Sequence, residues 1–154
     1  MGMKFLLFTV DSASYGIAAE AVGEMVRAVA VAPLPGAPAA IAGIIDVRGS
    51  IVPVFDMRVR LGASHRAVSP DDHFILVHAT GRTAALHVDT VVELVEIDPA
   101  AIATASAQLP PTPLIAGVAL LPSGLTLIHD VDSFLSTAES ETLETALTAS
   151  AARS

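Results

Sequence analysis

Short apolar runs separated by turn residues recur along the whole chain. Glycine, proline, aspartate and serine interrupt the runs, a pattern that predicts many short strands and favours an all-β barrel or sandwich. Beyond Val131, Ser136 or Thr137 is expected to cap a terminal helix over Ala138–Ala149. Pro53 lacks a backbone N–H and favours an edge or a bulge. The predicted strands are Lys4–Val10, Tyr15–Ala18, Met25–Ala32, Ile41–Val47, Ile51–Val59, Phe74–Ala79, Ala84–Asp89, Val91–Ile97, Ile115–Leu121 and Leu125–Asp130.

One β-hairpin pattern occurs twice. Asp56 lies thirteen positions after Gly43, and Asp130 lies thirteen positions after Gly117, each pair enclosing two apolar arms and a turn. Upstream, Phe5–Phe8 resembles Phe74–Val77 and Tyr15–Val26 resembles Ala84–Val95, both at an offset of 69 positions. Similar segments that recur in the same order predict an internal duplication. We therefore expect one domain over residues 4–135, built from two β modules at about 4–62 and 73–135, followed by a helix or tail over 136–154.

Composition narrows the function classes. The 154 residues include no cysteine, which excludes disulfides and thiolate metal sites. No apolar run reaches the length of a membrane helix, and Asp11 interrupts the first run too early for a secretory signal, so a cytoplasmic protein without membrane insertion is expected. The net charge of −8, with few and scattered basic residues, argues against nucleic-acid binding.

Candidate chemistry is sparse. Asp89-Thr90 resembles the start of an aspartic protease site, but Val91 stands where that turn needs glycine, and the repeat-equivalent acid, Glu20, lacks the motif. His87 and Asp89 share a strand face, and His129 lies in a second acidic stretch, yet no spacing makes them converge on a metal. There is neither a Gly-x-Ser-x-Gly elbow nor a P-loop. The sequence predicts a binding module with no catalytic residue, metal or cofactor.

The first hairpin carries the most specific pattern, the run from Gly43 to Gly62. Gly49 permits a positive φ at the turn. Arg48, at the predicted tip, presents a fork of donors suited to a carboxylate or to backbone carbonyls of a partner. Asp56 is interpreted as a local cap because Asp130 repeats it, whereas Arg48 has no counterpart in the second hairpin, where Pro122 or Ser123 takes its place.

This run resembles the CheW family of chemotaxis coupling proteins, whose characteristic pattern is Gly-Ile-Ile-Asn-Leu-Arg-Gly-x-Ile-x-Pro-Val-x-Asp-Leu-Arg. The likeness extends from about Phe5 to Leu135 and includes Val22-x-Glu24-Met25-Val26. Asp46 departs from the pattern where the family usually has asparagine. An ionised aspartate accepts but does not donate hydrogen bonds, so an amide donor contact there would be lost.

The resemblance implies two interleaved five-stranded SH3-like barrels and no catalysis. It implies a scaffold that couples the cytoplasmic tips of chemoreceptors (methyl-accepting chemotaxis proteins) to the regulatory domain of a CheA-type histidine kinase. Matching the motifs places Val22, Glu24 and Arg48 in or beside the receptor groove between the barrels, and kinase contacts at the barrel ends. Two alternatives stay open: the same fold in a twitching or gliding array, and an aspartic-type hydrolase using Asp89.

Overall fold

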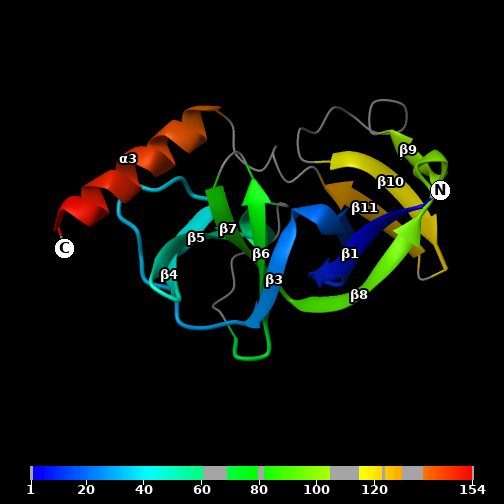
Figure 1. Ribbon diagram of the computed structural model, residues 1–154, viewed down its shortest axis with the longest axis horizontal. Helices are drawn as coiled ribbons and strands as arrows, with labels where there is room; N and C mark the ends of the chain where they lie inside the picture. Colours follow the sequence, from blue (N-terminus) through cyan, green and yellow to red (C-terminus); the bar gives the residue numbers. More distant parts are fainter. Residues whose placement is uncertain are drawn as a thin grey trace.

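The chain folds into two β-sheets and a C-terminal helix (Figure 1). The computed structural model describes residues 2–60, 69–79, 82–104, 115–122, 124–129 and 137–153. Its strands are β1 (Met3–Val10), β2 (Ala13–Ala18), β3 (Val22–Arg27), β4 (Ile41–Val47), β5 (Ser50–Asp56), β6 (His73–Ala79), β7 (Arg82–Val88), β8 (Thr90–Ile97), β9 (Ile102–Thr104), β10 (Ile115–Leu121) and β11 (Gly124–His129). The helices are α1 (Met57–Arg60) and α3 (Thr137–Arg153), with 3-10 turns η1 (Ala19–Ala21) and η2 (Pro99–Ala101).

Each sheet combines strands from both halves of the sequence. Sheet A has six strands in the order β8-β1-β2-β11-β10-β9, and sheet B has five in the order β3-β6-β7-β5-β4. Replacing each strand of sheet B by its repeat equivalent reproduces the order of the first five strands of sheet A. The interleaved SH3-like arrangement predicted from the resemblance is thus confirmed, with β9 as a short addition.

The duplication extends to the pairing register. Ile41 pairs with Phe55 and Gly43 with Val54, so that Ala42 is bulged, and Ile115 with His129 and Gly117 with Ile128 repeat the same shift. A second shared bulge lies on the edge strands, between Val22 and Glu24 in β3 and at the equivalent position of β8. Because bulges redirect a strand, both sheets bend at equivalent places.

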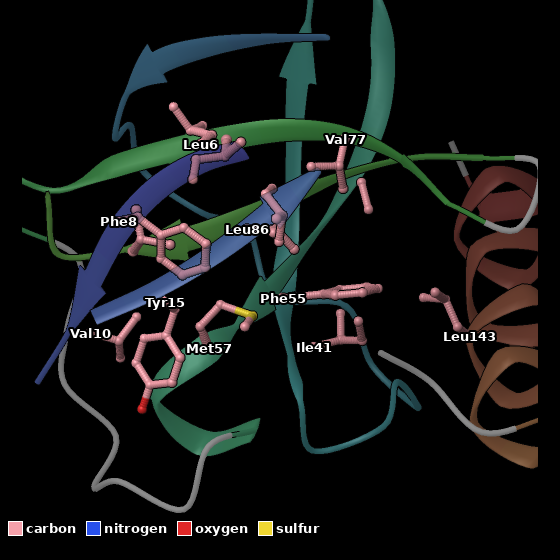
Figure 2. Close-up of a cluster of buried hydrophobic side chains, with 14 of the residues drawn as sticks. Leu6, Phe8, Val10, Tyr15, Ile41, Phe55, Met57, Val77, Leu86 and Leu143 are labelled. Atoms are coloured by element: carbon pink, nitrogen blue, oxygen red, sulfur yellow. The ribbon is translucent and has the colours of Figure 1, made fainter. Parts of the chain in front are cut away.

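Among the described residues, the largest hydrophobic core cluster lies between the sheets (Figure 2). Leu6, Phe8 and Ile17 from sheet A meet Phe55 and Leu86 from sheet B, all at most 4% exposed. Leu143 of α3 also joins this cluster and is fully buried. Figure 1 shows α3 at the end of sheet B that is far from sheet A. This cluster, the large core, consists of Leu6, Phe8, Val10, Tyr15, Ile17, Leu34, Ile41, Phe55, Met57, Ile75, Val77, Ala84, Leu86, Val88, Leu143 and Ala146.

Two predicted strands end earlier than expected. The predicted strand Ile51–Val59 stops at Asp56, because Oδ1 of Asp56 accepts hydrogen bonds from the backbone N–H groups of Arg58 and Val59 at 3.1 and 3.3 Å. That contact turns the chain into α1 and confirms the interpretation of Asp56 as a local cap. The predicted strand Met25–Ala32 becomes β3, which ends at Arg27. Asp130, the counterpart of Asp56 in the second hairpin, lies outside the described residues.

The segment after β3 instead covers the outer edge of β4. Ala32 and Ile44 exchange two backbone hydrogen bonds of 2.9 and 2.8 Å. Gly43 makes this approach possible: its φ is +155°, and a methyl group there would collide with the carbonyl oxygen of Ala32 and lie 2.7 Å from Cγ1 of Val31. A protected edge is one way in which proteins avoid unwanted strand pairing.

Candidate functional site

The first hairpin ends in a two-residue turn that displays Arg48. Val47 pairs with Ser50, and Arg48 and Gly49 both have positive φ, at 50° and 87°. Turns of this hand match the twist of the flanking strands. Oδ1 of Asp46 accepts the N–H of Gly49 at 2.8 Å, which closes the turn. The aspartate thus supplies an acceptor that an asparagine side chain would also offer.

Arg48 forms a forked ion pair with Glu24. Nη2 of Arg48 contacts Oε1 of Glu24, and Nη1 donates to Oε2 at 3.4 Å. Glu24 lies on β3 at one edge of sheet B, and Arg48 lies at the tip of the β4–β5 hairpin on the other side of that sheet. The pair therefore bridges the two sides of sheet B, and the structure brings together these two of the three residues assigned from the resemblance.

Both charges remain accessible. The side chain of Arg48 is 73% exposed and that of Glu24 is 37% exposed. The hydrogen bond from Arg48 lowers the pKa of Glu24, desolvation opposes that shift, and the positive charge of Arg48 adds to it. The same hydrogen bond and the charge of Glu24 raise the pKa of Arg48. Both groups are ionised at neutral pH and available to a charged or polar partner.

A pocket of about 370 Å³ opens beside the ion pair. Its lining combines the buried apolar side chains of Val52 and Leu76 with the polar residues Ser50, Thr83 and His78. Nδ1 of His78 and Oγ1 of Thr83 lie 3.1 Å apart in a hydrogen bond. Such a mixture suits a side chain with an aliphatic stem and a polar end, which is the usual composition of a recognition pocket. The full lining is Gly23, Glu24, Val47, Arg48, Ser50, Val52, Leu76, His78 and Thr83.

Val22 lies on the opposite face of β3. Because of the bulge at Gly23, Val22 pairs with Val77 and Glu24 with Leu76, which are consecutive residues of β6. Side chains alternate along a strand, so Val22 points to the large core, against which it is packed and partly buried. The structure brings Glu24 and Arg48 together and leaves Val22 outside their pocket.

Exposed apolar residues on the edge strands were not identified from the sequence. Met25 follows Glu24 on β3 and is 47% exposed, and its repeat equivalent on β8, Leu94, is 59% exposed. Val22 and its equivalent Val91 both pack against the large core. The two edge strands thus present matching apolar positions to the region between the sheets. The repeat was the available signal, because it aligns Met25 with Leu94.

The residues considered for chemistry are engaged elsewhere. The carboxylate of Asp89 accepts from Nη1 of Arg58 at 3.2 and 3.4 Å, an ion pair rather than half of a proton-sharing dyad. His87 is buried and lies 2.7 Å from Oδ2 of Asp72. Among the described residues, no cluster of three or more histidines, cysteines or acids is arranged to hold a metal ion. Over the same ranges, no helix has the length and hydropathy needed to cross a bilayer.

A duplicated β fold with an exposed ionic pocket and apolar edge strands defines a class of partner-binding proteins. The family model of the CheW-like domain matches residues 4–139, and the chain belongs to the CheW-like family. Among solved structures, the scaffolding protein TtCheW of Thermoanaerobacter tengcongensis is 30% identical with a TM-score of 0.79, over 90% of this chain and 96% of that one.

Two curated relatives are named chemotaxis protein CheW, and a third is named protein FrzA. The chemotaxis protein CheW of Klebsiella aerogenes is 27% identical over 143 residues, which is 90% of this chain and 85% of that protein. The chemotaxis protein CheW of Rhizobium meliloti is 27% identical over 115 residues, 75% and 70% of the two chains. Protein FrzA of Myxococcus xanthus is 31% identical over 91 residues, 59% and 57% of the two chains. The resemblance stated from the sequence is thereby confirmed.

Proposed function

We propose that this chain is a non-catalytic cytoplasmic scaffold that couples chemoreceptor tips to the regulatory domain of a CheA-type histidine kinase. The observation that carries the proposal is the forked Arg48–Glu24 pair, displayed at a hairpin tip beside an amphipathic pocket. Family membership supports the same role. The scaffold acts by contact, so it changes the populations of its partners' conformations rather than any covalent bond.

The proposed receptor surface uses both faces of β3. On one face, Glu24 and Arg48 are charged anchors for polar groups of the receptor tip. On the other, the exposed Met25 and its counterpart Leu94 provide apolar contact area, and the partly buried Val22 supports them from the core side. Arginine is typical of the residues that dominate binding energy at interfaces, and methionine is enriched at interfaces relative to the rest of the protein surface.

Replacing Arg48 by glutamate tests the proposal. The change places two carboxylates side by side and reverses the charge offered to a receptor, so we expect receptor binding to weaken about tenfold or more, which is ~1.4 kcal/mol. The site is exposed, and exposed substitutions usually change stability by less than about 0.5 kcal/mol, so the thermal midpoint should move by only about 1–2 °C. Binding of a soluble receptor fragment is measured by titration calorimetry, and the midpoint by circular dichroism.

Two variants serve as controls. Lys4→Glu reverses an exposed charge on sheet A and should leave receptor binding unchanged. The double variant Glu24→Arg with Arg48→Glu restores an ion pair of opposite polarity, so it should regain any lost stability without regaining binding. Receptor binding that survives Arg48→Glu, or an Arg48→Glu protein that does not fold, contradicts the assignment of Arg48.

A second candidate is that the same scaffold serves an array that controls twitching or gliding rather than a flagellar motor, and the relative FrzA of Myxococcus xanthus is compatible with it. The two candidates differ in the partners, not in the surface. Proteins captured by this chain from its native cell, identified by mass spectrometry, distinguish them: a receptor and kinase that act on a flagellar response regulator support the first, and those of a surface-motility system support the second.

A further inference from the structure

The described strands pass between the two sheets at two crossings. β2 of sheet A leads through η1 to β3 of sheet B, and β7 of sheet B leads through Asp89 to β8 of sheet A. The two crossings are equivalent in the duplication, because Glu20 in η1 is the repeat counterpart of Asp89. A difference between the two crossings is therefore a difference between the two halves of the duplication.

The β7–β8 crossing is fastened by a network centred on Arg58. Nη1 of Arg58 contacts the carboxylate of Asp89 at 3.2 and 3.4 Å, and Nη2 contacts Oδ1 of Asp11 at 3.1 Å. Oδ2 of Asp89 also accepts the backbone N–H of Asp11 at 2.8 Å, and the N–H of Asp89 donates to the carbonyl of Thr9 at 3.0 Å. Arg58 lies in α1 at the end of β5, so one side chain joins sheet B to the β1–β2 turn of sheet A.

The guanidinium of Arg58 suits this network because of its burial and its planar shape. The side chain of Arg58 is only 12% exposed, and that of Asp89 is 24% exposed. A charge so far removed from water is costly to leave unpaired, which opposes separation of the groups. The planar fork reaches two carboxylates at once, and the single ammonium of a lysine does not reproduce that geometry.

The other crossing lacks this chemistry. The repeat counterpart of Arg58 is Asp132, and that of Asp11 is Thr80, so neither equivalent position carries a cation that could meet Glu20. Within the described ranges Glu20 is exposed and forms no ion pair, and η1 buries none of its own residues. Glu20 is followed two residues later by β3, the strand that carries Glu24.

We propose that Arg58 is a one-sided ionic clasp: it fixes the angle between the two sheets at the β7–β8 crossing and leaves the β2–β3 crossing as the hinge. Relative motion of the sheets is then confined to the side of the molecule on which β3 presents the pocket residues. A change of the intersheet angle moves Met25 and Leu94 relative to each other, because they lie on different sheets.

Spin-label distances between the sheets test the clasp. The chain has no cysteine, so Ile51→Cys and Leu120→Cys, at positions 59% and 78% exposed on the hairpins of sheets B and A, give one labelled pair. In this labelled background Arg58→Gln is expected to broaden and shift the distance distribution measured by pulsed electron paramagnetic resonance. No partner is needed, so the result does not depend on the proposed function.

Arg82→Gln is the matched control. It removes an ion pair with Glu144 that ties α3 to β7 without linking the two sheets, and should leave the distribution unchanged. Should Arg58→Gln fail to fold, Asp11→Asn carries the same expectation, because Asp11 is 64% exposed in a turn. A folded Arg58→Gln or Asp11→Asn protein with the parent distribution overturns the clasp, as does equal broadening in Arg82→Gln.

Discussion

Arg48 adopts a left-handed backbone conformation that residues other than glycine rarely take, with φ of 50°. The strain is tolerated because Gly49 takes the second left-handed position and Asp46 closes the turn through its carboxylate. The sequence was sufficient to predict the turn that carries Arg48. It could not predict that Val22 and Glu24 face opposite ways, because that depends on a bulge against β6, a strand distant in sequence.

Gly43→Ala is expected to destabilise the fold by about 2–3 kcal/mol, since strained backbone costs on the order of 1–3 kcal/mol and the new methyl group also forces Ala32 away from β4. Chemical denaturation measures the loss. Gly49→Ala is the matched control: its φ is also positive, at +87°, but an added Cβ meets nothing within 4 Å, so only the strain remains. Equal losses in the two variants contradict a role for the close approach of Ala32.

At the scale of the elements, periodicity located nearly all the described strands, and contacts with other elements decided where they end. β5 stops at Asp56 because the side chain of that residue caps α1. Pro53 was expected at an edge or a bulge, and that prediction is wrong: it pairs with Ile44 inside β5, an inner strand. The parallel ladder to β7 begins only at Val54, so the missing N–H of the proline falls before the first paired residue.

Leu143→Ala tests how α3 is held. The leucine is fully buried against the large core, as Figure 2 shows beside Phe55 and Ile41, so its truncation is expected to cost about 2–4 kcal/mol. Leu147, one turn further along the helix, is only partly buried, and its replacement by alanine should cost clearly less. Denaturant midpoints of the two variants measure the difference, and a negligible loss for Leu143→Ala contradicts docking of α3 through this residue.

For the whole molecule, the internal echoes predicted duplication, and the resemblance supplied the interleaving. Apolar periodicity by itself cannot predict which hairpin enters which sheet, because β1–β2 and β6–β7 have equivalent patterns and either sheet offers a matching slot. The shared large core contains residues of both sheets and of α3. Each sheet therefore buries part of its apolar residues in a core that it shares with the other sheet.

A single cooperative transition is expected on heating. Because strands of each half complete the sheet of the other and both sheets bury the large core, loss of one sheet exposes the core face of its neighbour. Differential scanning calorimetry should give one peak with a ratio of calorimetric to van't Hoff enthalpy of about 1. Two resolved peaks, or a ratio well above that value, indicate sheets that unfold independently.

The interleaving of strands from both halves of the chain also has a consequence during synthesis. When Arg60 has been translated, β3 and the β4–β5 hairpin exist, but β6 and β7, which separate them in sheet B, have not yet been made. Phe8, Ile17 and Phe55 then lack Ile75, Val77 and Leu86, which share the large core with them in the finished protein. Sheet B therefore cannot assemble until the second half of the chain emerges from the ribosome. During that period the exposed apolar strands are sites for chaperone binding.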